Sequence, residues 1–280
     1  MKFGRSSCYV LPDAMTIPLL RWAGSKREHV PFLRQCWEGG SYTRYVEPFA
    51  GSAAVFFAVA PPRAILGDIN GELIQAYRAV CRAPHAVYRR LTRFPIGEAA
   101  YYRVRAMQPR SPVCKAARFV YLNRFCFNGL YRTNVQGLFN VPYGAPKTNN
   151  LPSLGQFRAC ADLLTRARLM PTDFRRALAR VEKGDFAYID PPYAISRRRL
   201  FIQYAKQHFS TDDLDDLSTA LDEIDRRKAF FVLSYADSRE ARSLFQGWRR
   251  RRFAVRRNVA GFSNARRNHY ELFISNIPAF

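Results

Sequence analysis

The sequence predicts an α/β protein whose sheet is interrupted by an inserted, mainly helical domain. Short apolar runs alternate with helix-compatible segments before residue 70 and again after residue 153. Between Gly71 and Leu151 this alternation stops, and the segment is rich in Arg and Tyr without a clear strand. A chain of 280 residues that is 48% apolar can bury one large core and a smaller one. We therefore expect residues 1–70 and 153–280 to form the sheet domain and residues 71–152 the insertion.

The charge of the chain indicates a polyanionic partner. It contains 45 Lys and Arg against 22 Asp and Glu, a formal net charge of +23. Such an excess is typical of proteins that bind nucleic acid. An anionic membrane surface is the alternative, but no run approaches the roughly 18 apolar residues of a membrane span, and the N-terminus lacks a signal-type apolar region. We expect a soluble, cytoplasmic protein; its oligomeric state is not predicted.

The cysteines and histidines give no reason to expect a metal. No C-x-x-C pair occurs, and no cysteine has a histidine at zinc-site spacing. The side chains in question are scattered along the chain, at Cys8, Cys36, Cys81, Cys114, Cys126, Cys160, His29, His85, His208 and His269.

The first element with a clear pattern is a loop followed by a helix. Residues 1–18 are weakly patterned, and Pro12 and Pro18 break them, so we expect a loosely attached arm. An Ala-Gly-Ser loop ending in Lys26 then precedes a predicted helix over 27–37. Such a loop can place Trp22 against an aromatic cofactor ring and Lys26 near a carboxylate. The alternative is an ordinary helix start with a solvated lysine.

The next segment has the layout of a nucleoside-binding unit. A strand over 45–47, a small-residue loop containing Phe49 and Gly51, a helix over 55–59 and a strand over 64–66 lead to Asp68. An acid after the second strand is where a carboxylate meets ribose hydroxyls in dinucleotide-binding folds. Because the loop has one glycine and no G-x-G, a structural unit without a ligand remains the alternative.

The insertion ends in a segment suited to contact with bases. Between residues 122 and 144, Asn and Arg alternate with aromatics and glycine turns. Asn and Arg are the side chains that bind base edges with two hydrogen bonds, and aromatics can stack or wedge. The alternative is a purely structural hairpin.

The stretch 185–193 is where we expect the chemistry. Phe186–Ile189 predicts a buried strand, which Pro191 and Pro192 end abruptly. An exocyclic amine such as adenine N6 or cytosine N4 is a poor nucleophile, because its lone pair is conjugated into the ring. Acceptors on Asp190 and the Pro191 carbonyl can draw it toward a pyramidal form, while Tyr193 stacks on the base, a contact worth roughly 1–3 kcal/mol. A turn without chemistry is the alternative.

The rest of the chain restores the α/β pattern. We expect a helix over 175–182, a helix start at 210–213, and strands over 230–233, 253–255 and 271–275. Arginines cluster at 249–252, 256–257 and 266–267, and so much unbalanced charge near the site favours contact with phosphates.

The order of these motifs resembles that of the Dam-type DNA adenine-N6 methyltransferases, class I enzymes that use S-adenosylmethionine. The likeness extends from Leu19 to Asn276. The matching segments are the N-terminal cofactor motif, the glycine loop, the ribose acid, the target-reading hairpin and the catalytic motif, at 20–26, 45–51, 67–70, 127–142 and 190–193 respectively.

The resemblance implies a role for each matching position. It implies a methyltransferase sheet with an inserted target-recognition domain, a bacterial or phage setting, and a target base flipped out of the duplex. The catalytic motif would be Asp190, Pro191, Pro192 and Tyr193. The residues that contact S-adenosylmethionine would be Trp22, Lys26, Phe49, Gly51, Asp68 and Asp190. Those that contact double-stranded DNA would be Arg21, Asn128, Leu130, Arg132, Asn134 and Pro142.

The chain departs from the family at a few positions. Ser25 and Ala53 stand where glycine is commoner, Pro146 lies near a wedging aromatic of some members, and Tyr235 replaces the commoner Asn. None of these removes a residue that the chemistry requires. We expect methyl transfer to adenine N6 in double-stranded DNA, with GATC as the site that the likeness suggests. The alternatives are transfer to cytosine N4 or to RNA adenine, and a DNA-binding relic without activity.

Overall fold

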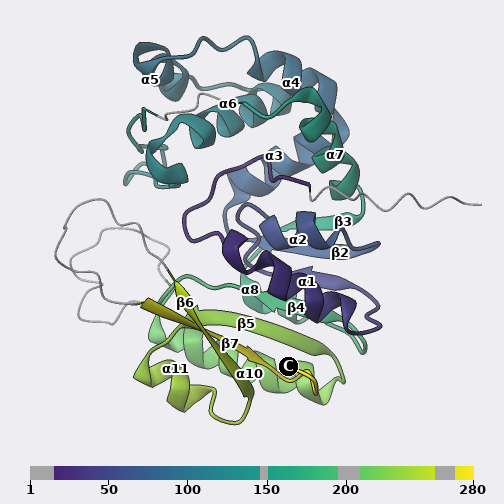
Figure 1. The fold of residues 1–280 in the computed structure, drawn as a ribbon. Helices are drawn as coiled ribbons and strands as arrows, with labels where there is room; N and C mark the ends of the chain where they lie inside the picture. The colour runs from purple at the N-terminus through teal and green to yellow at the C-terminus, as the bar shows by residue number, and fades with distance from the viewer. Residues whose placement is uncertain (1–15, 146–150, 195–208, 256–268) are drawn as a thin grey trace, which may run out of the picture.

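The computed structural model describes residues 16–145, 151–194, 209–255 and 269–280 (Figure 1). At its centre is a seven-stranded sheet of order β3-β2-β1-β4-β5-β7-β6. The first five strands in this order are parallel, β7 is antiparallel to β5, and β6 is antiparallel to β7. Their bounds are β1 Tyr45–Glu47, β2 Ala64–Asp68, β3 Ala167–Pro171, β4 Phe186–Ile189, β5 Phe230–Ala236, β6 Arg249–Val255 and β7 His269–Ser275.

Helices cover both faces of this sheet. On one face, α1 and α2 pack on Tyr45, Tyr188 and Phe273 in a core that continues into α3 and the helices beyond it. On the other face, α8, α10 and α11 pack on side chains such as Ile189 and Leu233. Their bounds are η1 Arg27–His29, α1 Val30–Glu38, α2 Ala54–Val59, α3 Gly71–Arg82, α8 Phe174–Leu178, α10 Thr211–Arg226 and α11 Arg239–Leu244.

A separate group of helices lies beyond α3 (Figure 1). It comprises α4 Pro84–Leu91, α5 Glu98–Ala106, α6 Pro112–Phe125, η2 Phe127–Gly129 and α7 Leu154–Leu164. Isolated bridges join Cys126 to Tyr143 and Thr133 to Phe139, so the segment after α6 folds back as a hairpin. Because α3 contacts both β3 and α6, it belongs to the sheet layer and the helical layer at once. The domain boundaries at 70/71 and 152/153 stay a prediction.

Local sequence explains the elements next to the site. β4 is buried along its whole length, and its start is fixed by Asp185, whose Oδ2 lies 2.6 Å from Nη2 of Arg44. α10 starts where the sequence predicts a helix start, and there Ser210 and Asp213 form a capping box. Asn70 caps α3 by accepting a hydrogen bond from Leu73 N at 3.1 Å.

Some expected elements have different limits. The predicted helix over 27–37 begins as a 3₁₀ turn and continues as α1, and the helix expected over 175–182 ends at Leu178. The arginine run 249–252 is part of strand β6 at the sheet edge. Arg256, Arg257, Arg266, Arg267, Pro146 and most of the predicted N-terminal arm lie outside the described residues. Within the described residues, no helix has the length and apolarity needed to cross a membrane.

The strand order fixes where a ligand can bind. From β1 the chain proceeds outward to β2 and β3, and the second series starts at β4 on the other side of β1. In open α/β sheets, ligands bind beyond the carboxyl ends of the strands at such a change of direction. Glu47 ends β1, and Asp190 directly follows β4, so both flank this point.

Candidate active site

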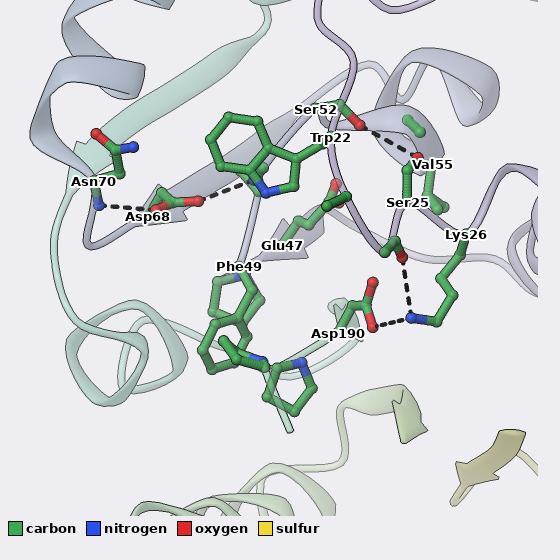
Figure 2. Close-up of a pocket in the computed structure, with 18 of the residues that line it drawn as sticks. Trp22, Ser25, Lys26, Glu47, Phe49, Ser52, Val55, Asp68, Asn70 and Asp190 are labelled. Atoms are coloured by element: carbon green, nitrogen blue, oxygen red, sulfur yellow. Dashed lines mark hydrogen bonds and ion pairs between the residues drawn. The ribbon is translucent and has the colours of Figure 1, made fainter. Parts of the chain in front are cut away.

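One large cavity lies at the carboxyl ends of β1, β2 and β4, with a volume of about 1180 Å³. Figure 2 shows Asp68 and Asn70 on one side of it and Lys26 and Asp190 on the other. The structure therefore brings together most of the residues selected from the sequence. Those that line the cavity are Trp22, Lys26, Phe49, Gly51, Asp68, Asn128, Leu130, Asp190, Pro191, Pro192 and Tyr193.

The carboxylate of Asp190 is held from two other elements. Its Oδ1 accepts a hydrogen bond from Ser234 Oγ on β5 at 2.9 Å and lies 2.8 Å from Nζ of Lys26. Burial raises the pKa of Asp190 above its ordinary value, while Lys26 and Ser234 favour the ionised form and oppose that rise. Because both contacts reach Oδ1, Oδ2 can accept a hydrogen from a bound amine.

Lys26 lies between two carboxylates and is only 8% exposed. Its Nζ is 2.8 Å from Asp190 Oδ1 and 3.4 Å from Glu271 Oε1. Burial alone lowers the pKa of the ammonium, but the two carboxylates outweigh burial, so the pKa is raised. Lys26 therefore stays protonated, and its charge favours the ionised form of Asp190. Its expected contact with the cofactor stays a prediction.

The ring of Tyr193 is fixed at its hydroxyl and along one side. The hydroxyl donates to Glu271 Oε1 at 2.9 Å, and the ring meets Tyr235 edge to face with centroids 5.7 Å apart. The Tyr235 hydroxyl accepts a hydrogen bond from Ala194 N at 2.8 Å. Tyr235, one of the departures from the family pattern, thus anchors the chain directly after the Asp-Pro-Pro-Tyr motif. The side chain of Tyr193 is still 37% exposed, which leaves room for a flat ring to stack on it.

Asp68 and Trp22 form the other end of the cavity. The two oxygens of Asp68 accept hydrogen bonds from Gly51 N at 2.9 Å and Asn70 N at 2.8 Å. Burial raises the pKa of Asp68, and these two bonds oppose that rise. Each oxygen keeps a second acceptor position, so Asp68 can also bind the hydroxyls of a ribose. The Trp22 ring, stacked beside Tyr131 at 6.2 Å, supplies a flat surface for a purine.

The loop between β1 and α2 contains backbone in the left-handed region. Gly51 has φ +47°, and a Cβ added there would lie 2.8 Å from Cδ1 of Trp22. Ala53 has φ 52°, a conformation that costs a residue with a Cβ roughly 1–2 kcal/mol. Ser25 accepts a hydrogen bond from Ser52 Oγ at 3.4 Å, which ties the two loops together. The two departures from glycine, Ser25 and Ala53, thus alter the loops and remove no cavity-lining group.

Glu47 adds a second buried acid to the cavity wall. It ends β1, and its Oε2 accepts a hydrogen bond from the Tyr45 hydroxyl at 3.0 Å. Burial raises the pKa of Glu47 well above its ordinary value. Its carboxyl therefore binds a proton far more readily than a surface glutamate does.

The residues predicted to contact DNA fall into two groups. Asn128 and Leu130 line the cavity, and Arg21 packs against Gly129 between them, where an added Cβ would lie 2.8 Å from Cβ of Arg21. This first group forms one rim of the cavity. The second group, Arg132, Asn134 and Pro142, is exposed on the hairpin and is not part of the cavity wall within the described residues.

Side chains of the hairpin also maintain its shape. Nε of Arg132 donates to Asn140 Oδ1 at 2.9 Å, which orients the guanidinium. Oδ1 of Asn134 accepts from the backbone amides of Gln136 and Leu138 at 3.1 and 2.9 Å. The turn therefore depends on Asn134, whose expected contact with DNA stays a prediction. The carbonyl of Pro142 accepts from Phe127 N at 3.0 Å.

Sequence reasoning assigned no role to Ser234, Glu271 or His29. Ser234 directly follows the predicted strand 230–233, where a polar residue lies at the carboxyl end of a parallel strand. Glu271 is an acid at the start of an otherwise apolar run. Both patterns are visible in the sequence, but neither indicates Asp190 or Tyr193 as a neighbour. No group of three His, Cys, Asp or Glu side chains within the described residues is placed to hold a metal ion.

A parallel-centred α/β sheet with a nucleoside-type pocket and an Asp-Pro-Pro-Tyr motif at the strand switch defines a methyltransferase-type site. Comparison with known proteins agrees with this class. The profile of the D12 class N6 adenine-specific DNA methyltransferases matches residues 22–259. The chain therefore belongs to this family and is an adenine-specific DNA methyltransferase, and the expected α/β fold class is confirmed.

Individual relatives match over most of the chain. It is 30% identical over 270 residues to the type II methyltransferase M1.LlaDCHI of Lactococcus lactis subsp. cremoris, with 92% of this chain and 95% of that protein covered. It is 33% identical over 248 residues to the retron Ec67 DNA adenine methylase of Escherichia coli, with 86% and 85% covered. It is 31% identical over 243 residues to the DNA adenine methylase of Vibrio cholerae, with 81% and 84% covered.

Proposed function

We propose that this enzyme transfers the methyl group of S-adenosylmethionine to N6 of an adenine flipped out of double-stranded DNA, with GATC as its site. The observation that carries the proposal is that Asp190 and Tyr193 share one cavity with Trp22 and Asp68. One end of this cavity suits a nucleoside, and the other suits a flat base with an exocyclic amine.

The residues present fit S-adenosylmethionine. Trp22 offers an aromatic surface for its adenine, and Asp68 has acceptor positions left for its ribose. The acids Glu47 and Asp190, which also line the cavity, suit its cationic groups. Gly51 allows the Trp22 ring to lie directly against the loop. When bound, the cofactor supplies an electrophilic methyl group.

Gly51→Ala is expected to raise the Kd for S-adenosylmethionine about tenfold, which corresponds to about 1.4 kcal/mol. The added Cβ would overlap Trp22 at 2.8 Å, so the ring has to move away from its place in the pocket. Calorimetric titration in the presence of a metal chelator measures this Kd. Gly155→Ala is the control, because a Cβ there makes only an ordinary contact at 3.8 Å with Ser153. An unchanged Kd for Gly51→Ala would show that Trp22 does not contact the cofactor.

The acceptors at the other end prepare the amine. Asp190 Oδ2 and the Pro191 carbonyl can each accept one N6 hydrogen, which frees the nitrogen lone pair to attack the methyl carbon. If the nitrogen takes the methyl group from bound S-adenosylmethionine, the amine would acquire a positive charge. Asp190 stabilises this charge and can take the proton that the product loses. Tyr193 keeps the base in plane by stacking.

The rim of the cavity and the hairpin suit a DNA duplex from which one base is flipped out. Arg21 and Arg132 carry the positive charge expected next to phosphates and base edges. Apolar side chains on this side are unusually exposed and can fill the gap that a flipped base leaves. They are Phe127 at 45%, Leu130 at 38%, Val135 at 78% and Leu138 at 44% exposure.

A fluorescent duplex tests both the flipping and the site. With 2-aminopurine in place of the adenine of a single GATC, binding is expected to raise the fluorescence several-fold, because the base leaves the stack. The same duplex with 2-aminopurine outside GATC serves as the control. An equal response at both positions would contradict GATC, and no response with tightly bound DNA would contradict flipping.

A further inference from the structure

Glu271 is a buried acid that the proposed chemistry does not use. It lies on β7, is 5% exposed and contributes to the cavity wall. Its Oε1 accepts the hydroxyl of Tyr193 at 2.9 Å and lies 3.4 Å from Nζ of Lys26. Its Oε2 lies 3.8 Å from Nε2 of His29. A single carboxylate oxygen therefore contacts both the stacking tyrosine and the lysine that is paired with Asp190.

The position of Glu271 in the fold would suit an apolar side chain. The next residues of β7, Leu272, Phe273 and Ile274, are buried and apolar. Across the ladder, Glu271 is opposite Ala236 on β5 and Phe253 on β6, neither of which is charged. Burying a carboxylate costs several kcal/mol unless it is paired. Within the described residues, the charged and hydroxyl partners of Glu271 all belong to the site. The sheet therefore gives no reason for a glutamate at position 271, whereas its partners in the active-site cavity do.

We infer that Glu271 is a positioning residue for methyl transfer, which fixes the amine acceptor and the stacking ring relative to each other. This inference rests on the proposed function. The contacts form a closed circuit: Asp190 to Lys26, Lys26 to Glu271, Glu271 to Tyr193, and back to Asp190 through the two prolines of the motif. This circuit fixes the Tyr193 ring, on which the base stacks, relative to the acceptor oxygen of Asp190 before the base binds. Small errors in this relative position lower the rate of methyl transfer.

The charge of Glu271 also has a measurable effect on its neighbours. Within the described residues, the titratable groups that face it are Lys26, His29, Tyr188, Asp190 and Tyr193. The negative charge of Glu271 contributes to the raised pKa of both Lys26 and Asp190. Removing that charge lowers both values. The acid limb of the rate profile, where Asp190 binds a proton, and the alkaline limb, where Lys26 loses one, then both move to lower pH. Burial lowers the pKa of His29, the other titratable side chain next to Oε2 of Glu271.

Glu271→Gln, measured by single-turnover methyl transfer on pre-bound DNA, tests the inference. We expect a rate about tenfold below wild type, both pH limbs at lower pH, and Kd values for cofactor and DNA within about threefold. Glu271→Asp keeps the charge but shortens the reach, so its rate should fall while its pH limbs stay where wild type has them. A wild-type rate and profile for Glu271→Gln would overturn the inference, as would a loss confined to binding.

Tyr193→Phe provides an independent test, because it removes only the hydroxyl that Glu271 binds. The residue is partly exposed, so the substitution is compatible with the fold. We expect a rate about threefold lower, and a smaller effect of Glu271→Gln in this background than in wild type, since the two changes break one contact. If Glu271→Gln folds, strict additivity of the two rate effects would overturn the inference. If Glu271→Gln does not fold, an unchanged rate for Tyr193→Phe would overturn it. A wild-type enzyme that transfers no methyl group would instead refute the proposed function.

Discussion

Replacing Asp190 with alanine is expected to slow methyl transfer by about 10³- to 10⁴-fold while cofactor and DNA affinity change by less than about fivefold. The carboxylate acts on the amine as the new bond forms, and the loss of a contact made mainly in the transition state lowers the rate rather than the affinity. The variant also removes one of the two carboxylates next to Lys26 and leaves that of Glu271. We expect this loss to change the affinities for cofactor and DNA only slightly. Rapid-quench kinetics with labelled methyl donor measure the rate. Turnover near wild type would exclude Asp190 as the amine acceptor.

Asp185, at the other end of β4, gives a matched control with the opposite result. It is also a buried aspartate with a cationic partner, Arg44 at 2.6 Å, but it is not part of the cavity wall. Breaking a buried pair costs about 3–5 kcal/mol, so Asp185→Asn should lower Tm by about 5–10 °C. Its rate of methyl transfer per folded molecule should stay within about twofold of wild type. A rate loss equal to that of Asp190→Ala would show that the assay reports folding.

Replacing Arg132 with alanine is expected to relax sequence preference by about 5- to 150-fold. A bidentate contact with a base is worth roughly 1–3 kcal/mol of discrimination, and 1.4 kcal/mol is a factor of ten. The bond from Nε to Asn140 orients the guanidinium and leaves its terminal amino groups available to a guanine. Sequencing the methylated positions made by wild type and variant measures the preference. An unchanged profile would assign Arg132 to a phosphate or to the hairpin itself.

The control for Arg132 is an exposed arginine outside the hairpin. In the run 249–252, Arg251 lies over the rings of Phe32 and Phe280, and Arg252 binds Asp237 at 2.7 Å. Arg250 makes only a bond to a backbone oxygen within the described residues, so it is the better choice. Arg250→Ala should weaken binding to all sequences alike and reduce the salt slope by about one. A shift in the methylated sequence would contradict this phosphate role.

The sequence predicts this fold best where one local rule determines the structure. Strand β4 has the predicted limits because a short apolar run ends at two prolines, and α10 starts at its capping box. For strand β6, the sequence predicts only residues 253–255, because the first four positions of the strand are arginines, which hydrophobic periodicity does not assign to a strand. Edge strands tolerate such charge, but a sequence without strand order does not show which strand is at the edge.

The difference between local patterns and long-range packing also explains which site residues the sequence predicts. Asp68 and Asp190 occur in short motifs at the ends of strands, and Trp22 occurs in the loop motif before η1, so local patterns selected all three of these cavity-lining residues. Ser234 and Glu271 reach Asp190 and Lys26 only because β5 lies beside β4 and β7 beside β5. That adjacency, and the antiparallel direction of β7, depend on packing between segments far apart in the chain.

The most direct test of the central claim is the identity of the methylated base. DNA from a host without its own adenine methylation is incubated with the enzyme and S-adenosylmethionine, digested to nucleosides and analysed by mass spectrometry. Asp190→Ala, treated identically, gives the background. We predict N6-methyldeoxyadenosine as the methylated product, at levels that match the number of GATC sites in the substrate. N4-methyldeoxycytidine, or no methylated nucleoside from folded enzyme that binds both substrates, would contradict the proposed reaction.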